Sequence, residues 1–96
     1  MDDLLNIAGR VALITGGARG IGAATAKLLA LHGADIIILD LKRTDESDRT
    51  LRAVQQAGRR ALLIEADVSQ TEKVAQVCRE AEKTMGPVDI LVNNAG

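Results

Sequence analysis

Aromatic side chains are absent from this sequence of 96 residues, which contains no Phe, Trp or Tyr. Their absence removes the usual stacking surfaces for single-stranded nucleic acid and the usual anchors of a protein-recognition hot spot. An excess of one charge is also absent, because 12 Lys and Arg residues nearly balance 13 Asp and Glu residues and leave a formal net charge of −1. This balance gives no reason to expect nucleic acid or an anionic membrane as a partner.

Cysteine, histidine and long apolar runs are scarce as well. The single cysteine, Cys78, cannot form an internal disulfide, and no cluster of Cys and His residues offers a metal site. No apolar run approaches the ~18 residues that a membrane-spanning helix requires, and the acidic N-terminus lacks the basic segment and apolar core of a secretory signal. We therefore expect a cytoplasmic protein with no metal and no membrane partner.

Four short apolar runs are what the sequence does contain. They occupy residues 10–15, 35–40, 61–66 and 89–93, and their apolar residues are continuous rather than alternating. Continuous runs are typical of strands that are buried on both faces of a parallel sheet. The sequence therefore predicts four parallel strands.

The stretches between these runs have the spacing of amphipathic helices. Three helices are predicted, one after each of the first three strands. Their expected apolar faces consist of Ile21, Ala24, Leu28 and Leu29 in the first helix, Leu51, Val54 and Ala57 in the second, and Val74, Val77, Cys78, Ala81 and Met85 in the third.

The signals for the helix ends differ in strength from one helix to the next. A loose, polar and charged stretch at residues 41–48 is expected to precede the second helix. Ser69 and Glu72 have the spacing of a capping box at the start of the third helix. Gly86 and Pro87 form a firm stop at its end.

The order β-α-β-α-β-α-β describes a single domain over residues 1–96. Right-handed crossovers make the sheet parallel, and the expected strand order is 3-2-1-4. This is an α/β fold, the first half of a Rossmann-like doubly wound sheet. In such a sheet, ligands bind at the carboxyl ends of the strands, near the switch between strands 1 and 4.

The stretch TGGARGIG, residues 15–22, joins the first strand to the first helix and contains four glycines in eight residues. The N-terminus of a helix presents unpaired N–H groups and a partial positive charge, so an anion such as a phosphate fits there. Gly16, Gly20 and Gly22 would allow the turn, the approach of the anion, and close packing of the helix on the sheet. The loop therefore predicts a phosphate-containing ligand.

Other loop types fit less well. A P-loop nucleotide hydrolase needs Gly-Lys-Ser/Thr at the end of the loop, and this sequence lacks it. The G-x-G-x-x-G dinucleotide loop does not fit either, because residue 18 is alanine. A strand-to-helix turn with a purely structural role is the remaining alternative.

Polar side chains follow the other strands. Asp40 ends the second strand, Asp67 follows the third and Asn93 ends the fourth. An acid about 20 residues beyond the loop can accept both ribose hydroxyls of an adenosine, and Asp67 could accept from the adenine amine. Each acid alone could be a helix N-cap or a solvated turn residue. Together with the loop, these residues favour an adenine dinucleotide.

These motifs resemble the N-terminal half of the short-chain dehydrogenase/reductase family over the whole chain. TGGARGIG is similar to that family's T-G-x(3)-G-x-G cofactor loop, ADVS at residues 66–69 resembles its adenine-contacting Asp-Val, and NNAG at residues 93–96 resembles its N-N-A-G motif. The resemblance implies a nicotinamide cofactor and hydride transfer between an alcohol and a ketone. By this match, Thr15, Gly16, Arg19, Gly20, Ile21 and Gly22 would line the pyrophosphate, Asp40 and Leu41 the adenosine ribose, Asp67 and Val68 the adenine, and Asn93, Ala95 and Gly96 the nicotinamide-side ribose.

Charge at the ribose predicts NAD rather than NADP. The 2′-phosphate of NADP would sit where Asp40 is expected, and like charges ~4 Å apart repel by about 4 kcal/mol at an effective dielectric near 20. Arg19, Lys42 and Arg43 could reach a phosphate, but exposed pairs of that kind contribute roughly 1 kcal/mol or less.

The family's catalytic residues have no match here. They are a Ser, a Tyr and a Lys in a Y-x-x-x-K pattern with a further Asn, and the chain has no tyrosine, so no catalytic residue is assigned. The last strand would also be an uncovered sheet edge. We therefore expect a chain that is truncated after strand 4, is inactive alone, and belongs to a homo-oligomeric oxidoreductase acting on a small alcohol or ketone. A nucleotide-binding or partner-docking module without chemistry, an inactive remnant and a methyltransferase are the alternatives, although a methyltransferase would not explain NNAG.

Overall fold

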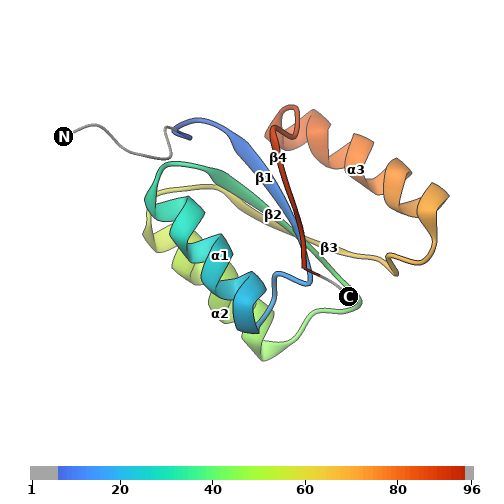
Figure 1. The fold of residues 1–96 in the computed structure, drawn as a ribbon, viewed down its shortest axis with the longest axis horizontal. Helices are drawn as coiled ribbons and strands as arrows, with labels where there is room; N and C mark the ends of the chain where they lie inside the picture. The colour runs from blue at the N-terminus through green and yellow to red at the C-terminus, as the bar shows by residue number, and fades with distance from the viewer. Residues whose placement is uncertain (1–6, 95–96) are drawn as a thin grey trace.

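The computed structural model describes residues 7–94 and has the predicted alternation of strands and helices (Figure 1). Each strand lies within one residue of the apolar run that predicted it. The elements in chain order are β1 (Val11–Thr15), α1 (Gly20–Leu31), β2 (Asp35–Asp40), α2 (Asp45–Gln56), β3 (Ala61–Glu65), α3 (Thr71–Met85) and β4 (Ile90–Asn93).

The four strands form one parallel sheet with the order β3-β2-β1-β4. Val11 pairs with Asp35 across β1 and β2, and Ile36 pairs with Ala61 across β2 and β3. On its other side β1 pairs with β4, where Ala12 lies opposite Ile90. The predicted Rossmann-like half-fold and its strand order are therefore confirmed.

Helices cover both faces of the sheet: α1 and α2 lie on one side and α3 lies on the other (Figure 1). Alternate residues of a strand point to opposite faces. In β2, Ile36 and Ile38 pack in the cluster under α1 and α2, whereas Ile37 and Leu39 pack in the cluster under α3. All four side chains are fully buried, which explains why the run is continuously apolar.

The predicted apolar face of α1 is largely wrong. Ile21 and Leu28 were expected to face the sheet, but they are 77% and 50% exposed. Because this helix is apolar or small on almost every side, its periodicity does not define one face. The helix packs close to the sheet, so small residues form the contact: its buried residues are Gly22, Ala23, Ala26 and Ala30.

Helix α2 begins earlier than the sequence indicated. The stretch expected to be loose ends at Thr44, and Asp45 is the first helical residue. The Thr44 hydroxyl accepts a hydrogen bond from the Ser47 backbone N–H (3.1 Å), and the Ser47 hydroxyl oxygen accepts one from the Thr44 N–H (2.8 Å). This reciprocal capping box uses Ser at a position where Glu or Gln is usual, so the sequence pattern did not identify it.

Helix α3 also starts differently from the prediction. Ser69 is not its N-cap; Gln70 is, and its side chain makes no capping hydrogen bond. The Ser69 hydroxyl instead donates to Oδ1 of Asp67 (2.8 Å), which also accepts from the Ser69 N–H (2.9 Å). The Asp67 carboxylate forms a local turn and competes successfully for the hydroxyl. The end of the helix at Met85 agrees with the predicted stop, and Gly86 follows with φ of 93°.

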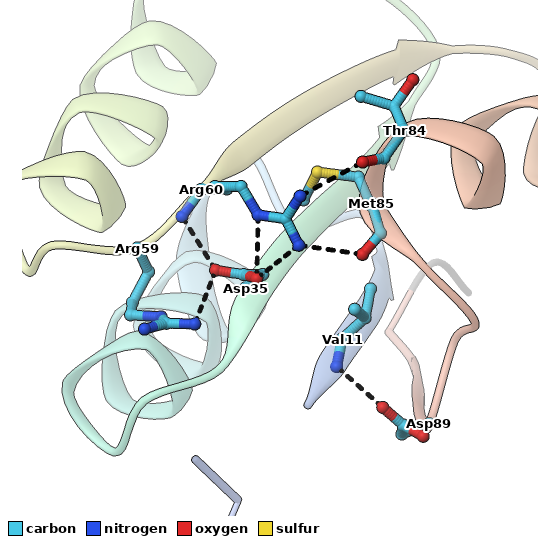
Figure 2. A network of polar contacts seen from close by, with 7 residues as sticks. All are labelled: Val11, Asp35, Arg59, Arg60, Thr84, Met85 and Asp89. Atoms are coloured by element: carbon cyan, nitrogen blue, oxygen red, sulfur yellow. Dashed lines mark hydrogen bonds and ion pairs between the residues drawn. The ribbon is translucent and has the colours of Figure 1, made fainter. Parts of the chain in front are cut away.

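At the amino end of the sheet, the buried carboxylate of Asp35 connects three elements (Figure 2). Its oxygens accept hydrogen bonds from Arg60 through the backbone N (3.0 Å), Nε (3.0 Å) and Nη2 (2.8 Å), and Arg59 Nη2 lies 3.0 Å from Oδ1. The Arg60 guanidinium also donates to the carbonyls of Thr84 and Met85 (3.1 and 3.0 Å). These are terminal carbonyls of α3 that lack helical partners, so Arg60 ties α3 to the start of β2.

The pKa of Asp35 reflects opposing effects. Burial favours the neutral acid and is the largest single influence, but the hydrogen bonds from Arg60 and the charges of Arg59 and Arg60 together lower the pKa below its usual value. The ionised form therefore stabilises the fold. That contribution is fully present above the pKa of the unfolded chain and is lost as pH falls through the lower folded value.

Asp35→Asn should lower the free energy of unfolding by about 2–3 kcal/mol near neutral pH, because it removes the anion between two guanidinium groups; the partial exposure of both arginines keeps the loss below that of a fully buried pair. The difference between wild type and variant should shrink below about pH 4. Urea unfolding over a pH series measures both effects. Glu65→Gln removes an exposed carboxylate and is the matched control. Parallel loss of stability by wild type and Asp35→Asn on acidification would contradict this assignment.

Candidate functional site

The glycine-rich loop lies at the carboxyl edge of the sheet, between β1 and α1. Gly16 and Gly20 have φ of 67° and 60°, a region that residues with a Cβ adopt only at a cost of roughly 1–2 kcal/mol. The Gly16 N–H donates to the Leu39 carbonyl at 2.8 Å, which fixes the start of the loop against β2. Two of the glycines are thus required by the backbone conformation alone.

Gly22 has a different role, which is close packing. A Cβ at this position would lie 2.3 Å from the Gly16 carbonyl oxygen, 2.8 Å from Nδ2 of Asn94 and 2.9 Å from the Gly17 Cα. Real Cβ atoms do not approach backbone so closely, so the first turn of α1 can lie against the loop only with glycine here. This contact directs the N-terminus of α1 toward the edge of the sheet.

The N-terminus of α1 is suited to an anion. Its N-cap, Arg19, has extended backbone angles and, within the described chain, makes no side-chain capping hydrogen bond. No acidic residue lies in the first turn. The N–H groups of Gly20, Ile21 and Gly22 have no carbonyl four residues earlier within the helix. An anion placed here would accept from these groups and meet the positive end of the helix dipole.

The end of β4 is bound to the start of the same loop. The Thr15 hydroxyl donates to Oδ1 of Asn93 (3.1 Å) and accepts from the Asn94 N–H (3.0 Å). Nδ2 of Asn94 donates to the Gly16 carbonyl at 3.1 Å. Sequence reasoning selected Thr15 and Asn93 but did not assign a contact to Asn94. The sequence signal for Asn94 was the pair of consecutive asparagines after the last strand. In the structure Asn93 contacts Thr15, and Asn94 contacts both Thr15 and Gly16.

Asp40, half-buried at the end of β2, faces a hollow beside the loop. The cavity has a volume of about 200 Å³ and is lined by Ala18, Arg19, Asp40, Leu41, Lys42, Thr44 and Glu46. Oδ1 of Asp40 accepts from the Leu41 N–H at 2.9 Å, which orients the carboxylate and leaves its second oxygen available for another donor. The structure therefore places three predicted residues, Arg19, Asp40 and Leu41, around one hollow.

A smaller hollow of about 70 Å³ adjoins it, lined by Gly16, Leu39, Asp40, Leu41, Ala66 and Val68. It connects the loop to the ends of β2 and β3. Leu41 and Val68 are exposed apolar side chains on its walls, at 63% and 45%. The linings of the two cavities show that the glycine-rich loop, Asp40 and Val68 lie at one edge of the sheet.

Asp67 is committed to a local turn. Its carboxylate accepts from the N–H and hydroxyl of Ser69, and these hydrogen bonds lower its pKa below the usual value despite a small opposing effect of desolvation. Asp67 is therefore a fixed, ionised acceptor at the end of β3. Its contacts match the turn-residue role that the sequence left open beside adenine binding. Of the remaining predicted residues, Ile21 is exposed on the first turn of α1, and Ala95 and Gly96 lie outside the described residues.

Larger hollows also lie on the described chain. One of about 500 Å³ runs along α1 and α2 and shares Arg19 with the Asp40 hollow, one of about 590 Å³ lies at the start of α3, and one of about 410 Å³ lies between β3 and α3. All three are wide surface grooves. Over residues 7–94 no group of three or more His, Cys, Asp or Glu residues is arranged to hold a metal, and none of the helices described is long and apolar enough to cross a membrane.

Gly22→Ala should lower the free energy of unfolding by about 1–3 kcal/mol, as overpacking does, and should shift the amide NMR signals of residues 16, 17 and 94. Gly58→Ala is the matched control, because it adds the same methyl group at a position where no other group lies within 4 Å of that methyl. The control should lose stability through its φ of 84° alone and leave the loop signals unchanged. Unchanged loop signals in Gly22→Ala would contradict the packing role.

Comparison with known proteins agrees with this geometry. The family model described as "short chain dehydrogenase" matches residues 10–96. The chain is 46% identical over 87 residues to cis-4-hydroxycyclohexanecarboxylate dehydrogenase of Sinomonas cyclohexanicum, covering 91% of this chain and 34% of that protein. It is 40% identical over 91 residues to the short-chain dehydrogenase/reductase homolog YusS of Bacillus subtilis, covering 95% of this chain and 84% of YusS.

Solved structures give the same result. The crystal structure of a short chain dehydrogenase from Mycobacterium paratuberculosis bound to NAD superposes with a TM-score of 0.87 at 35% identity, over 95% of this chain and 38% of that one. NAD⁺-bound xylitol dehydrogenase has a TM-score of 0.87 at 34% identity, over 94% and 34% of the two chains. The chain spans about a third of the length of the Sinomonas dehydrogenase and of both these structures. On the family model, the relatives and the shared fold together, this chain belongs to the short chain dehydrogenase family.

Proposed function

We propose that this chain is the cofactor-binding part of an NAD-dependent oxidoreductase that transfers hydride between a small alcohol or ketone and nicotinamide. The observation that carries the proposal is the position of Asp40. Its carboxylate lines a hollow with Arg19 and Leu41, directly beside the glycine-rich loop. An adenosine diphosphate moiety fits this arrangement, because its ribose diol can bind the carboxylate while its phosphates lie at the loop. The NAD-bound relatives support the same assignment.

The pyrophosphate belongs at the loop in this proposal. The N–H groups of Gly20, Ile21 and Gly22 are donors without helical partners, and at Gly20 no other group lies within 4 Å of the place that a Cβ would occupy. The donor set therefore fits a diphosphate. Arg19 adds a cation beside it. Thr15 and Gly16 hold the loop in place through their contacts with β4 and β2.

Asp40 and Leu41 are proposed to bind the adenosine ribose, and Asp67 and Val68 the adenine. The carboxylate of Asp40 can accept from both hydroxyls of a ribose diol. Leu41 and Val68 offer apolar surface on the walls of the adjoining hollow, and Asp67 is an ionised acceptor for an exocyclic amine. Asn93, Ala95 and Gly96 are assigned to the nicotinamide-side ribose on the family motif. When bound, NAD supplies the ring that accepts or donates the hydride.

The chemical step requires residues beyond those assigned. The family's general base is the tyrosine of a Y-x-x-x-K pattern, and a base must reach the substrate hydroxyl within hydrogen-bond distance. These 96 residues contain no tyrosine. We therefore propose that they bind the cofactor and do not catalyse by themselves, and that the complete enzyme is a cytoplasmic homo-oligomer acting on a small alcohol or ketone.

NAD is the proposed cofactor rather than NADP. A 2′-phosphate would face the Asp40 carboxylate, with a repulsion of about 4 kcal/mol at ~4 Å and an effective dielectric near 20. It would also remove the paired hydrogen bonds to the diol, which contribute another ~1.5–3 kcal/mol. Exposed cations nearby return roughly 1 kcal/mol or less each. The balance favours the dinucleotide with a free diol.

Asp40→Ala should weaken NAD binding by about tenfold or more, since the diol loses its charged acceptor, and should strengthen NADP binding because the repulsion is gone. Calorimetry with both dinucleotides on wild type and variant measures this. Asp45→Ala removes an exposed carboxylate at the start of α2 without touching the hollow and is the control. Equal affinity of the wild type for NAD and NADP would overturn the choice of cofactor.

A further inference from the structure

An ion pair joins two residues that lie close in sequence to Lys42, Thr44 and Glu46 of the Asp40 hollow. Nε of Arg43 is 2.6 Å from Oδ1 of Asp48. The two side chains are 57% and 35% exposed, so the pair is accessible to solvent and can exchange partners. Arg43 is one of three cations in the sequence that could meet a phosphate at the adenosine ribose.

The backbone around the pair is well fixed. Thr44 and Ser47 form the reciprocal capping box described above, and the Asp48 N–H donates to the Thr44 carbonyl at 3.0 Å. The carboxylate of Asp48 therefore projects from a rigid first turn of α2, toward the residue that precedes the cap. Arg43, which precedes the N-cap, donates to this carboxylate from outside the helix.

Arg43 is adjacent in the chain to residues that line the hollow, but its side chain pairs with Asp48. Its chain neighbours, Lys42 and Thr44, both line the cavity with Asp40, whereas Arg43 is absent from the described lining residues. Asp40 and Arg43 are three residues apart, so their Cα atoms are at most about 11 Å apart. The long side chain of Arg43 can span much of this distance when it is not held by Asp48.

We propose that Asp48 is a positioning residue for cofactor selection: it holds the Arg43 guanidinium on α2 and so denies a 2′-phosphate a second guanidinium partner beside Arg19. Guanidinium groups bind phosphate through paired hydrogen bonds and are preferred over ammonium groups for this purpose. Selectivity for the 2′-hydroxyl form then has two sources, repulsion by Asp40 and sequestration of Arg43 by Asp48. This inference deepens the proposed function and rests on it, because it assumes that the hollow holds an adenosine ribose.

The test measures binding of 2′,5′-ADP (adenosine 2′,5′-bisphosphate) and 5′-AMP by calorimetry, because these two probes differ only at the 2′ position and do not need the nicotinamide side. The background is Asp40→Ala, in which the repulsion is absent. Adding Asp48→Asn should raise affinity for 2′,5′-ADP by about three- to fivefold, the range for exchange of an exposed ion pair. Affinity for 5′-AMP should stay unchanged.

A double-mutant cycle separates the role of Asp48 from its charge alone. In an Arg43→Gln background, Asp48→Asn should give no more gain than Asp45→Asn, which removes an exposed acid from the same helical turn. A general electrostatic effect would instead give the same gain with or without Arg43. Thermal unfolding of each variant verifies that α2 remains folded.

The outcomes distinguish this inference from the function on which it rests. Binding of 5′-AMP with no Arg43-dependent gain for 2′,5′-ADP overturns the role of Asp48 and leaves the proposed function intact. Absence of binding for both probes overturns the ribose assignment and the inference together. An intact cycle in a chain that fails to bind NAD supports the role of Asp48 and contradicts only the assignment of the nicotinamide side.

Discussion

The first turn of α1 lies so close to the end of β1 that a methyl group on Gly22 would come within 2.3 Å of the Gly16 carbonyl oxygen. The other features of the carboxyl edge depend on this contact. It sets the direction of the unpaired N–H groups of α1, and the same carbonyl accepts from Asn94 at 3.1 Å. The loop, the helix and the end of β4 are therefore positioned by one crowded backbone atom. A small shift there would move an anion site and the β4 terminus together.

The opposite end of the sheet has a stabilising role that the candidate site does not require. Asp35 and Arg60 connect the starts of β2 and β3 to the last carbonyls of α3, and Asp89 exchanges hydrogen bonds with Val11 at the start of β4, through its carboxylate (3.0 Å) and its N–H (2.9 Å) (Figure 2). The charged residues at this end are paired with one another or with backbone groups, and the buried Nε of Arg59 is the exception among the described residues. At the carboxyl end, backbone donors at α1 and an oxygen of Asp40 are left for a ligand. Rigidity and recognition thus occupy different edges of the same sheet.

The strands and their order were predictable because continuous apolar runs and right-handed crossovers leave few arrangements. The sequence also identified the loop glycines and Asp40, since conformation and position at a strand end restrict the residue type. It did not identify the buried face of α1, where Gly22 and Ala26 are selected by close packing in a helix that is apolar almost throughout. The start of α3 was wrong because Asp67 captures the Ser69 hydroxyl, and local competition between two acceptors cannot be read from spacing.

Charge at the end of β2 shows the same limit more sharply. The sequence alone does not show whether Lys42 and Arg43, next to Asp40, are available to bind a phosphate or are already paired with other acids. What decides is which charges are already paired. Arg43 is held by Asp48 through a turn whose geometry depends on an unusual capping serine, whereas the Asp40 carboxylate receives only the Leu41 N–H among the hydrogen bonds seen at this edge. In the proposed function the Asp40 carboxylate faces the ribose while Asp48 holds Arg43, and Arg19 and Lys42 are the cations that line the hollow. In this proposal selectivity depends on the ion-pair arrangement, so a substitution of Asp48, which does not touch the ligand, should change it as well, although by a smaller factor than a substitution of Asp40.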